Sequence, residues 1–515
     1  VAVVGFYNLE NFFDTVNNPI IDDEEFLPSG PKQYNSTIYW DKVQKLSSVI
    51  AQIGSHINPD GPAILGVSEI ENDTVLADLV KLADTNIRAA VLHELLDDLA
   101  WRGFVFQHTD GLGDALARGR VTAYCGFDPT ASSLHVGNLV PVMGLLHLQR
   151  GGHRPLVLVG GGTGMIGDPS GKSAERQLNT PAIVAANVAA IRAQLGHFLD
   201  FDGPSGALMR DNADWLSGLG ALEFMRDVGK HFTISYMLQK ESVKSRLDAG
   251  ISYTEFSYML LQAYDFLSLY RHDGVTLQVG GSDQWGNMTA GMELIRRVEG
   301  GEANVLTFPL VTTAAGTKFG KTEAGAVWLD PARTSPYQFY QFWMKADDRD
   351  VSRFLRLFTL LDRSEIEALE EAAAAHPEQR AAQRALAADV TRRVHGDDAL
   401  RAAEQVSALL FGGGDAAALS AEALTALAAE IPSARLDAGD ALDTERVIDA
   451  LTVAPTALFK SKGEARRMIQ QGGLYLNGSR FPAERQAIGA DQLLQGRYLL
   501  ARKGSRNYAL LDVGR

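Results

Sequence analysis

From residue 87 onwards, amphipathic helical patterns alternate with short apolar runs that are typical of strands. The expected elements are a helix, a strand, a second helix that ends at two glycines, and a buried strand with a glycine-rich turn, over residues 91–104, 120–128, 139–152 and 153–171. Such alternation predicts an α/β fold with a parallel, Rossmann-like sheet. Ligands are expected at the carboxyl ends of its strands.

Two motifs in the glycine-rich turn match nucleotide-binding patterns only in part. Gly162-Thr-Gly164-Met-Ile-Gly167 has the dinucleotide spacing, but the acidic residue that this fingerprint needs ~20 positions further on is missing. Residues 166–173 nearly match a phosphate-binding P-loop, except that Ile166 replaces the first glycine. We interpret both motifs as tight strand-to-loop packing. A dehydrogenase and a P-loop NTPase are therefore excluded.

The composition changes abruptly near residues 84–90. Residues 1–86 contain 4 Lys, no Arg and 13 Asp and Glu, which gives a net charge of −9. They also hold 8 Asn, as many as the following 429 residues together, while Arg is frequent and Ala dominant after Arg88. We infer that two segments of different origin are joined here. An ordinary acidic N-terminal domain remains the alternative.

The first segment is expected to form a strand, a loop, a helix over 42–53 and a second strand. FYNLENFFDT (residues 6–15) and GVSEIEN (residues 66–72) resemble the endonuclease/exonuclease/phosphatase family of metal-dependent phosphoesterases. The resemblance implies that Asn8 and Glu69 help to hold Mg²⁺, and oxygen ligands suit such a hard cation. The later His and Asp motifs of that family do not follow. We therefore expect an appendage without nuclease activity and without a metal site.

The most specific signal is YCGFDPTASSLHVGN at residues 124–138, combined with KFGKT at residues 318–322. Together they resemble class I aminoacyl-tRNA synthetases, in which a His-x-Gly-His motif and a Lys-rich loop bind ATP. His135 can donate a hydrogen bond to a phosphate, and Gly137 lets the nucleotide approach the backbone closely. Lys318 and Lys321 are point charges suited to a phosphate on which negative charge develops.

Three positions depart from the common class I pattern. Asn138 stands where many members have a second His, and Phe319 and Thr322 vary the usual Lys-Met-Ser-Lys-Ser loop. Asn can still donate a hydrogen bond to the nucleotide, but it cannot carry a charge. These changes can alter the rate, and we expect an active enzyme.

Four further stretches, residues 159–179, 251–266, 277–287 and 318–331, resemble bacterial tyrosyl-tRNA synthetases. The resemblance runs from about Val91 to the C-terminus. It implies roles for single residues. Tyr124 and Asp265 would bind the phenolic hydroxyl of the substrate, Asp168, Tyr258 and Gln262 its ammonium group, and Gln284 would lie near its carboxylate. ATP would contact Gly126, Asp128, His135, Gly137, Gly281, Asp283 and Lys321, with Cys125 beside them, and the catalytic set would be Thr130, His135, Asn138, Lys318 and Lys321.

The spacing of three of these residues supports the assignment independently. Tyr258, Gln262 and Asp265 occupy positions i, i+4 and i+7 of a helical pattern, so they share one face. Met, Leu, Tyr and Phe surround them, and a buried polar stripe needs partners because unpaired polar groups are costly. A solvated helix face is the alternative explanation of this stripe.

The C-terminal third is expected to contain a helical domain and then a basic one. Residues 335–440 are rich in Ala, Leu and Glu with helical periodicity that Gly412–Gly414 interrupt, whereas residues 451–515 hold 11 Lys and Arg against 4 Asp and Glu, a net charge of +7. LFKSKGEARRMIQQGGLYLNGSRF resembles a small RNA-binding fold. A clustered cationic face attracts phosphates, so the predicted tRNA contacts are Lys460, Lys462, Arg466 and Arg467, on or next to one helix that ends at Gly472-Gly473 before a YLNG hairpin. A solvated basic helix is the alternative.

These observations predict four domains, at residues 1–86, 87–334, 335–445 and 446–515. The expected activity is that of a tyrosine–tRNA ligase that uses Mg·ATP, L-tyrosine and tRNA(Tyr) and needs no tightly bound cofactor. The resemblance implies a homodimer. No apolar run approaches the ~18 residues of a membrane helix, no export signal is evident, and the single cysteine suits the cytoplasm. The rival hypotheses are a metal-dependent phosphoesterase and a non-catalytic RNA-binding paralogue.

Overall fold

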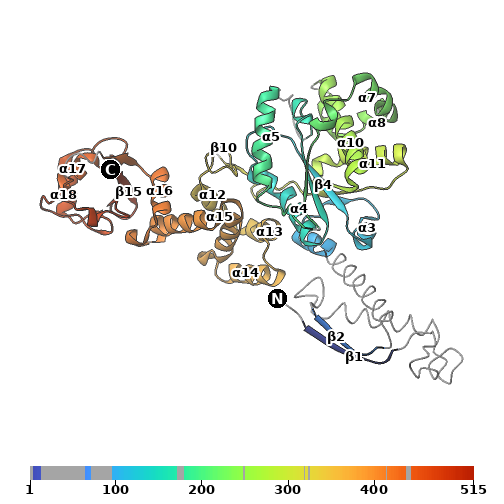
Figure 1. Ribbon diagram of the computed structural model, residues 1–515. Coiled ribbons are helices and arrows are strands. Elements are labelled where there is room, and N and C mark those ends of the chain that lie inside the picture. Colours follow the sequence, from blue (N-terminus) through green and yellow to red (C-terminus); the bar gives the residue numbers. More distant parts are fainter. Residues whose placement is uncertain are drawn as a thin grey trace. The chain divides into compact units, whose positions relative to one another are not determined.

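The computed structural model describes residues 4–12, 64–70, 95–170, 179–203, 205–247, 250–317, 319–322, 325–412, 414–436 and 442–514. The chain divides into two compact units, which Figure 1 shows. The first unit contains Val1–Ser132 and Val140–Leu310, and the second contains Ser133–Leu139 and Val311–Arg515. A short piece of the sequence, Ser133–Leu139, thus belongs to the second unit although the first unit surrounds it in sequence.

A six-stranded sheet forms the centre of the first unit, in the order β3-β8-β7-β4-β5-β6. Its strands are β3 (Gln107–His108), β4 (Thr122–Phe127), β5 (Arg154–Val159), β6 (Leu208–Asp211), β7 (Val275–Gly281) and β8 (Asn304–Phe308). All neighbours are parallel except β3, which pairs antiparallel with β8. Residues 155–159 of β5 are all buried, as expected for a parallel strand that is covered on both faces. The predicted Rossmann-like sheet is confirmed.

Helices cover this sheet (Figure 1). They comprise a helix over residues 95–102 and then α3 (Leu112–Arg118), α4 (Leu139–Arg150), α5 (Pro181–Leu195), α6 (Ala213–Leu216), α7 (Ala221–Asp227), α8 (Ile234–Leu238), α9 (Glu241–Leu247), α10 (Tyr253–Asp273) and α11 (Trp285–Glu299). The helix predicted over 91–104 is thus present over the described residues 95–102, and the one predicted over 139–152 ends at Arg150. Gly144 of α4 lies against the ring of Phe308 on β8, where an added Cβ would come within 2.3 Å of that ring. Only glycine lets the helix approach so closely.

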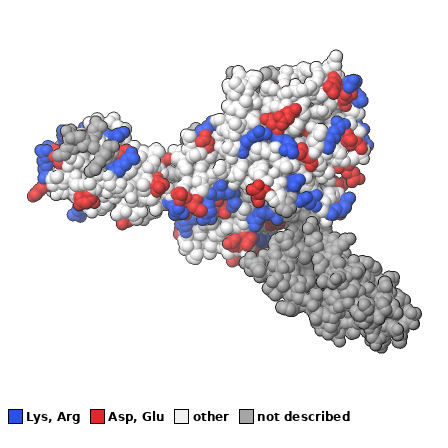
Figure 2. Space-filling view, in the orientation of Figure 1, with Lys and Arg blue, Asp and Glu red and all other residues white. Residues whose placement is uncertain are grey.

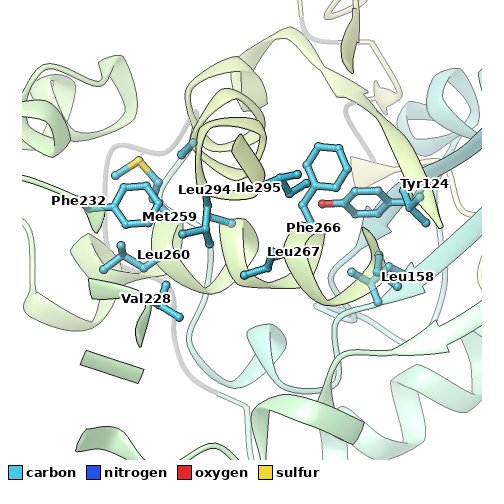
Figure 3. Packing of buried hydrophobic residues seen from close by; sticks show 14 of the residues in the cluster. Tyr124, Leu158, Val228, Phe232, Met259, Leu260, Phe266, Leu267, Leu294 and Ile295 are labelled. Atoms are coloured by element: carbon cyan, nitrogen blue, oxygen red, sulfur yellow. The ribbon is translucent and has the colours of Figure 1, made fainter. Parts of the chain in front are cut away.

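A hydrophobic core of the first unit lies between the strands and the long helix α10. Tyr124 of β4 and Leu158 of β5 pack with Phe266 and Leu267 of α10 in a cluster that also includes Leu294 of α11 (Figure 3). The Ser252 hydroxyl caps α10 by accepting a hydrogen bond from the backbone N–H of Glu255, and Gly274, with φ of 64°, ends it. The core fixes α10 against the sheet, and with it the polar residues that α10 carries.

A buried ion pair ties α9 to the first turn of α10. The guanidinium of Arg246 donates to both carboxylate oxygens of Glu255 at 3.0 and 2.9 Å, and the two side chains are 4% and 2% exposed. Such bidentate geometry satisfies a buried carboxylate.

From Pro336 onwards, the second unit continues with helices. They are α12 (Pro336–Met344), α13 (Asp348–Phe358), α14 (Arg363–Ala375), α15 (Ala381–Gly412) and α16 (Ala421–Glu430), and α15 bends at Gly396, where φ is 85°. The helical character predicted for this region is confirmed. The last helix of the expected stretch, however, gives way to a strand, because β11 (Ser433–Arg435) follows α16 after only two residues.

A five-stranded sheet, in the order β11-β15-β14-β12-β13, forms the C-terminal part of the second unit. Its other members are β12 (Leu474–Leu476), β13 (Ser479–Arg480), β14 (Tyr498–Lys503) and β15 (Asn507–Asp512), accompanied by α17 (Thr444–Ala450) and α18 (Lys462–Gln470). The predicted basic helix and hairpin are thus confirmed. The hairpin turns at Asn477 and Gly478, whose φ angles of 48° and 87° suit the twist of the strands.

The acidic N-terminal segment contributes two parallel strands, β1 (Val4–Phe12) and β2 (Ile64–Ile70), with Asn8 opposite Ser68. Both strands were predicted, but the helix expected over 42–53 lies outside the described residues, as do the side chains of Asn8 and Glu69. Among the helices that the structure describes, none is long and apolar enough to cross a membrane.

Candidate active site

Tyr124 lies at the centre of the parallel sheet with its side chain 1% exposed. Its ring packs against Phe266 at a centroid distance of 5.2 Å, and Figure 3 shows the ring reaching from β4 towards α10. In the described part of the chain, the Tyr124 hydroxyl has no hydrogen-bond partner. Burial, and secondarily the charge of Asp265, raises the pKa of this phenol well above its usual 10. A neutral, buried and unpartnered hydroxyl is costly, so it marks a position where a ligand can donate or accept.

Asp265 of α10 is the nearest carboxylate that influences this phenol. It is buried and accepts hydrogen bonds from Asn212 Nδ2 at 2.9 Å and from Trp215 Nε1 at 2.8 Å. Burial raises the pKa of Asp265 to about 7, although the two hydrogen bonds from Asn212 and Trp215 act in the opposite direction. The Asp265 carboxyl therefore accepts hydrogen bonds from two oriented donors, and its protonation state changes near neutral pH.

Asn212 and Trp215 were not among the predicted site residues. They follow β6 on a turn and on the short helix α6, so the carboxyl end of a parallel strand again supplies polar groups. A detectable signal was present, because Asn is rare after residue 86 and this one stands beside two acidic residues in RDNADW.

Asp128 connects the end of β4 to α10 and to the glycine-rich turn. Its two carboxylate oxygens accept hydrogen bonds from the Tyr258 hydroxyl at 2.8 Å and from Thr163 Oγ1 at 2.7 Å. Asn212 Nδ2 donates to Thr163 Oγ1 at 2.9 Å, which joins this group to Asp265. Burial, followed by the charge of Asp128, raises the pKa of Tyr258 well above 10.

A second polar group contains Asp168, Gln262 and Gln284, three residues predicted to bind one substrate. Gln284 Nε2 donates to Asp168 Oδ2 at 2.6 Å, and the backbone N–H of Ser170 donates to Asp168 Oδ1 at 2.9 Å. Asn287 of α11 donates to the amide oxygens of both Gln262 and Gln284, at 3.1 and 3.2 Å. The structure brings the three predicted residues together and adds Asn287, which the sequence interpretation missed.

The glycine-rich turn approaches the carboxylates of this region closely. A Cβ on Gly160 would lie 2.2 Å from Asp128 Oδ1, and one on Gly161 would lie 2.3 Å from Asp211 Oδ1, which accepts a hydrogen bond from the Gly161 N–H. The glycines therefore let backbone amides pack against acidic side chains. This agrees with the interpretation of GGTGMIG as a packing motif.

The remaining predicted nucleotide positions of the first unit lie around the ends of β4 and β7. Gly126 is exposed with open space at its Cβ position, and Gly281 lies so close to Asp283 that a Cβ would meet its Oδ1 at 2.5 Å. Thr130 is exposed, and its backbone N–H donates to the Asp128 carbonyl oxygen at 2.8 Å. Burial raises the pKa of the Cys125 thiol to about 12, so this cysteine is no thiolate nucleophile.

The LHVGN segment belongs to the second unit, where His135 and Asn138 cap one turn of helix at residues 136–138. His135 Nδ1 accepts a hydrogen bond from the Gly137 N–H at 3.0 Å, and Asn138 Oδ1 accepts one from the His135 N–H at 3.0 Å. Because Nδ1 is an acceptor, a neutral His135 ring carries its proton on Nε2. Asn138, the predicted departure from the class I pattern, thus also holds the motif in shape.

LHVGN and KFGKT, nearly two hundred residues apart in sequence, lie side by side in the second unit. The Val136 N–H donates to the Val327 carbonyl oxygen at 3.0 Å, and the Leu329 N–H donates to the Leu134 carbonyl oxygen at 2.9 Å. The Val327 N–H in turn donates to the carbonyl oxygen of Gly320, at 3.1 Å. The two signature segments therefore form one backbone network.

The short hairpin β9 (Lys321–Thr322) and β10 (Gly325–Ala326) follows Gly320. Lys318 lies outside the described residues, and so does the side chain of Lys321. The roles predicted for these two lysines stay predictions.

The predicted RNA-contacting residues lie on α18 or just before it, and all four are exposed. Lys462 forms an ion pair with Asp449 at 2.5 Å and Arg466 one with Glu445 at 2.7 Å, whereas no ion pair of Arg467 is found among the described residues. Figure 2 shows both basic and acidic side chains on the surface of the C-terminal part of the chain. Some of the positive charge of α18 is thus neutralised locally by α17.

Residues 116–412 match the family model of class I tRNA synthetases for tryptophan and tyrosine. Residues 423–511 match the C-terminal domain of tyrosine–tRNA ligases of the SYY-like type, and residues 3–93 match the endonuclease/exonuclease/phosphatase family.

The chain is 55% identical to a tyrosine–tRNA ligase of Anaeromyxobacter dehalogenans over 422 residues, which are 82% of this chain and all of that protein. It is 51% identical to that of Geobacillus stearothermophilus, over 81% of this chain and 99% of the relative. Among solved structures, a C-terminally truncated mitochondrial tyrosyl-tRNA synthetase of Aspergillus nidulans is similar with a TM-score of 0.58 at 29% identity, over 64% of this chain and 99% of that one.

Proposed function

Since this chain belongs to the class I tyrosyl-tRNA synthetases and is a tyrosine–tRNA ligase, we propose that the polar pocket of its first unit binds L-tyrosine and that the signature segments of its second unit bind ATP. The enzyme activates tyrosine as tyrosyl-adenylate and transfers it to the 3′ end of tRNA(Tyr). The observation that supports the tyrosine pocket best is the buried Tyr124 hydroxyl, which has no hydrogen-bond partner among the described residues. It is the kind of group that a substrate phenol would satisfy.

In this proposal the phenol of the substrate lies between Tyr124 and Asp265. The Tyr124 hydroxyl can donate to the substrate oxygen, and Asp265, held by Asn212 and Trp215, would accept a hydrogen bond from the substrate hydroxyl. A phenylalanine would offer no partner to the buried Tyr124 hydroxyl and no hydrogen bond to Asp265. Tyrosyl-tRNA synthetases are known to discriminate tyrosine from phenylalanine by such pairing.

The ammonium group of the substrate would bind within the second polar group, which contains Asp168, Gln262 and Gln284. Asp168 and Gln262 already contact one another through Gln284 and Asn287. A cation that enters here meets an acceptor carboxylate and two amide oxygens, and Tyr258, fixed on Asp128, adds a further oxygen. Gln284 is then well placed to donate to the substrate carboxylate.

ATP is proposed to enter as its magnesium complex, with the metal as part of the substrate. The Nε2–H of His135 is the donor for a phosphate, and Gly137 keeps the backbone accessible. Lys318 and Lys321 would stabilise the charge that develops at the phosphates. A carboxylate oxygen of tyrosine bonds to the α-phosphorus, the bond from that phosphorus to the bridging oxygen breaks, and pyrophosphate leaves with the electron pair.

The second step needs no covalent intermediate on the enzyme. A ribose hydroxyl at the 3′ end of the tRNA attacks the carbonyl carbon of tyrosyl-adenylate, and AMP leaves as the hydroxyl proton is lost. Positioning and charge stabilisation therefore account for the catalysis. For the tRNA itself we propose Lys460, Lys462, Arg466 and Arg467 as phosphate contacts.

We also propose a homodimer in the cytoplasm. Several large apolar side chains on α7, α8, α9 and the start of α10 are exposed, and exposed apolar surface is typical of protein interfaces. They are Leu222, Met225, Ile234, Leu238, Leu247 and Tyr253. The division into domains at residues 1–86, 87–334, 335–445 and 446–515 is likewise part of the proposal.

The decisive experiment is tyrosine-dependent exchange of pyrophosphate into ATP. Exchange is expected with tyrosine and not with phenylalanine, and Lys321→Ala should reduce its rate strongly. Lack of exchange, or exchange that Lys321→Ala leaves unchanged, would contradict the proposed roles. Sedimentation analysis of the same protein tests the homodimer, and Tyr253→Glu should shift it to monomer.

A further inference from the structure

Phe319 is the second residue of KFGKT, yet its side chain is only 5% exposed. Its ring contacts four other aromatic rings at centroid distances between 4.9 and 5.7 Å, and it stacks on Phe358 with an interplanar angle of 17°. The other three partners are Phe342, Trp343 and Phe354. A side chain in the middle of a loop that is proposed to serve ATP is thus part of a hydrophobic core.

The four partner rings come from two helices. Phe342 and Trp343 lie on α12, and Phe354 and Phe358 lie one turn apart on α13, so they share a face. Trp343 and Phe358 are almost fully buried and contact each other at 5.0 Å. Rings packed in this way hold Phe319 in a defined place.

The backbone on the other side of Phe319 is fixed as well. The Phe319 N–H donates to the Val311 carbonyl oxygen at 3.2 Å. Gly320 has φ of 81°, and a Cβ there would lie 2.7 Å from Val136 Cγ2. The dipeptide therefore contacts α12 and α13 through its ring and the residue after His135 through its backbone.

We propose that Phe319 is a positioning residue for adenylate formation. It anchors the KFGKT loop on α12 and α13 and thereby sets the place of the two lysines beside it, since Lys318 precedes it directly and Lys321 follows two residues later. A phenylalanine ring carries no group that could act on a phosphate, so its effect passes through these neighbours. This inference rests on the proposed role of the lysines.

The test compares Phe319→Ala with Phe104→Ala, a matched truncation of a buried Phe in the first unit, where its ring packs on His147 and Phe308. For Phe319→Ala, kcat of pyrophosphate exchange per folded enzyme should fall on the order of 100-fold, as for a misplacement of about 1 Å. KM for tyrosine should not change, because the tyrosine pocket belongs to the other unit. Phe104→Ala should lose thermal stability and keep kcat.

Phe319→Met, which preserves most of the volume, should restore kcat close to that of the parent. Phe319→Leu and Phe104→Leu repeat the comparison if the alanine variants do not fold. Equal kcat losses in the Phe319 and Phe104 variants, or a raised KM for tyrosine with kcat intact, would overturn the inference.

A double variant separates this inference from the proposed function. If Phe319 acts through Lys318 and Lys321, the loss in Phe319→Ala combined with Lys321→Ala should be smaller than the product of the two single losses, because part of the effect of Phe319 passes through Lys321. A loss equal to the product of the two single losses would show that Phe319 acts independently, which would refute the positioning role. If Lys321→Ala alone leaves exchange unchanged, the proposed function of the loop fails instead.

Discussion

Tyr124→Phe should make the ligand-free enzyme more stable and its binding of tyrosine weaker. The hydroxyl that this change removes is buried without a partner among the described residues. An unsatisfied buried hydroxyl costs about 1–3 kcal/mol, so its removal should stabilise the free protein by an amount of that order. The unfolding temperature should then rise by about 2–4 °C for each kcal/mol in a domain of this size.

The same hydroxyl should contribute when tyrosine is bound. One hydrogen bond to a neutral group is worth about 0.5–1.5 kcal/mol, which corresponds to a rise in KM for tyrosine of roughly 2- to 13-fold. Thermal unfolding without ligand measures the first effect, and the tyrosine dependence of pyrophosphate exchange measures the second.

Tyr258→Phe is the matched control, because the Tyr258 hydroxyl is equally buried but donates to Asp128 at 2.8 Å. Its removal leaves a carboxylate oxygen without that donor, so the unfolding temperature should fall. The two Tyr→Phe changes should thus have opposite signs. A lower unfolding temperature for Tyr124→Phe would contradict the claim that the Tyr124 hydroxyl is unpaired in the free enzyme. An unchanged KM for tyrosine would contradict its hydrogen bond to the substrate.

Three further predictions concern stability and the N-terminal segment. Burial lowers the pKa of His153 and of His395 to about 4, so the unfolded chain binds more protons than the folded one between pH 6.5 and 4. The free energy of unfolding should therefore fall as the pH falls through this window. His153→Gln should flatten the dependence of the unfolding temperature on pH. Arg246→Met should cost about 3–5 kcal/mol in chemical denaturation because it leaves Glu255 buried and unpaired, whereas the double change to Met at both positions should recover most of that loss. Deletion of residues 1–86 should leave tyrosine-dependent exchange intact, and an unfolded product would show instead that the segment is integral.

The sequence predicts the sheet well because the relevant signals are local. The strand at 154–159 is a continuous apolar run between glycines, and the helices around it have regular apolar spacing. By contrast, β11 consists of Ser433, Ala434 and Arg435, which have no strand character of their own. It becomes a strand because its backbone pairs with β15, more than seventy residues later. Such a partner is not visible in a local pattern.

Some residues of the site could likewise be predicted from local patterns, whereas others could not. The stripe of Tyr258, Gln262 and Asp265 follows from helical spacing. Asp168 and Gln284, which the resemblance assigns to one substrate, are joined by a hydrogen bond. Asn212 has a local signal in the sequence, but its role depends on the glycine-rich turn and on α10, which its amide joins only in the folded chain. Spatial convergence, rather than residue type, makes it part of the pocket.

The grouping of Ser133–Leu139 with the second unit has a consequence for chimaeric enzymes. A crossover near residue 310 between two related genes would take the LHVGN segment from one parent and its backbone partners, Val327 and Leu329, from the other. The pairing of Leu134 and Val136 with Leu329 and Val327 uses main-chain atoms only, so it tolerates parents of different sequence. The contact of Gly320 with the Val136 side chain is less tolerant. A recombinant that brings any larger residue to position 320 should therefore lose adenylate formation, however well its two halves fold.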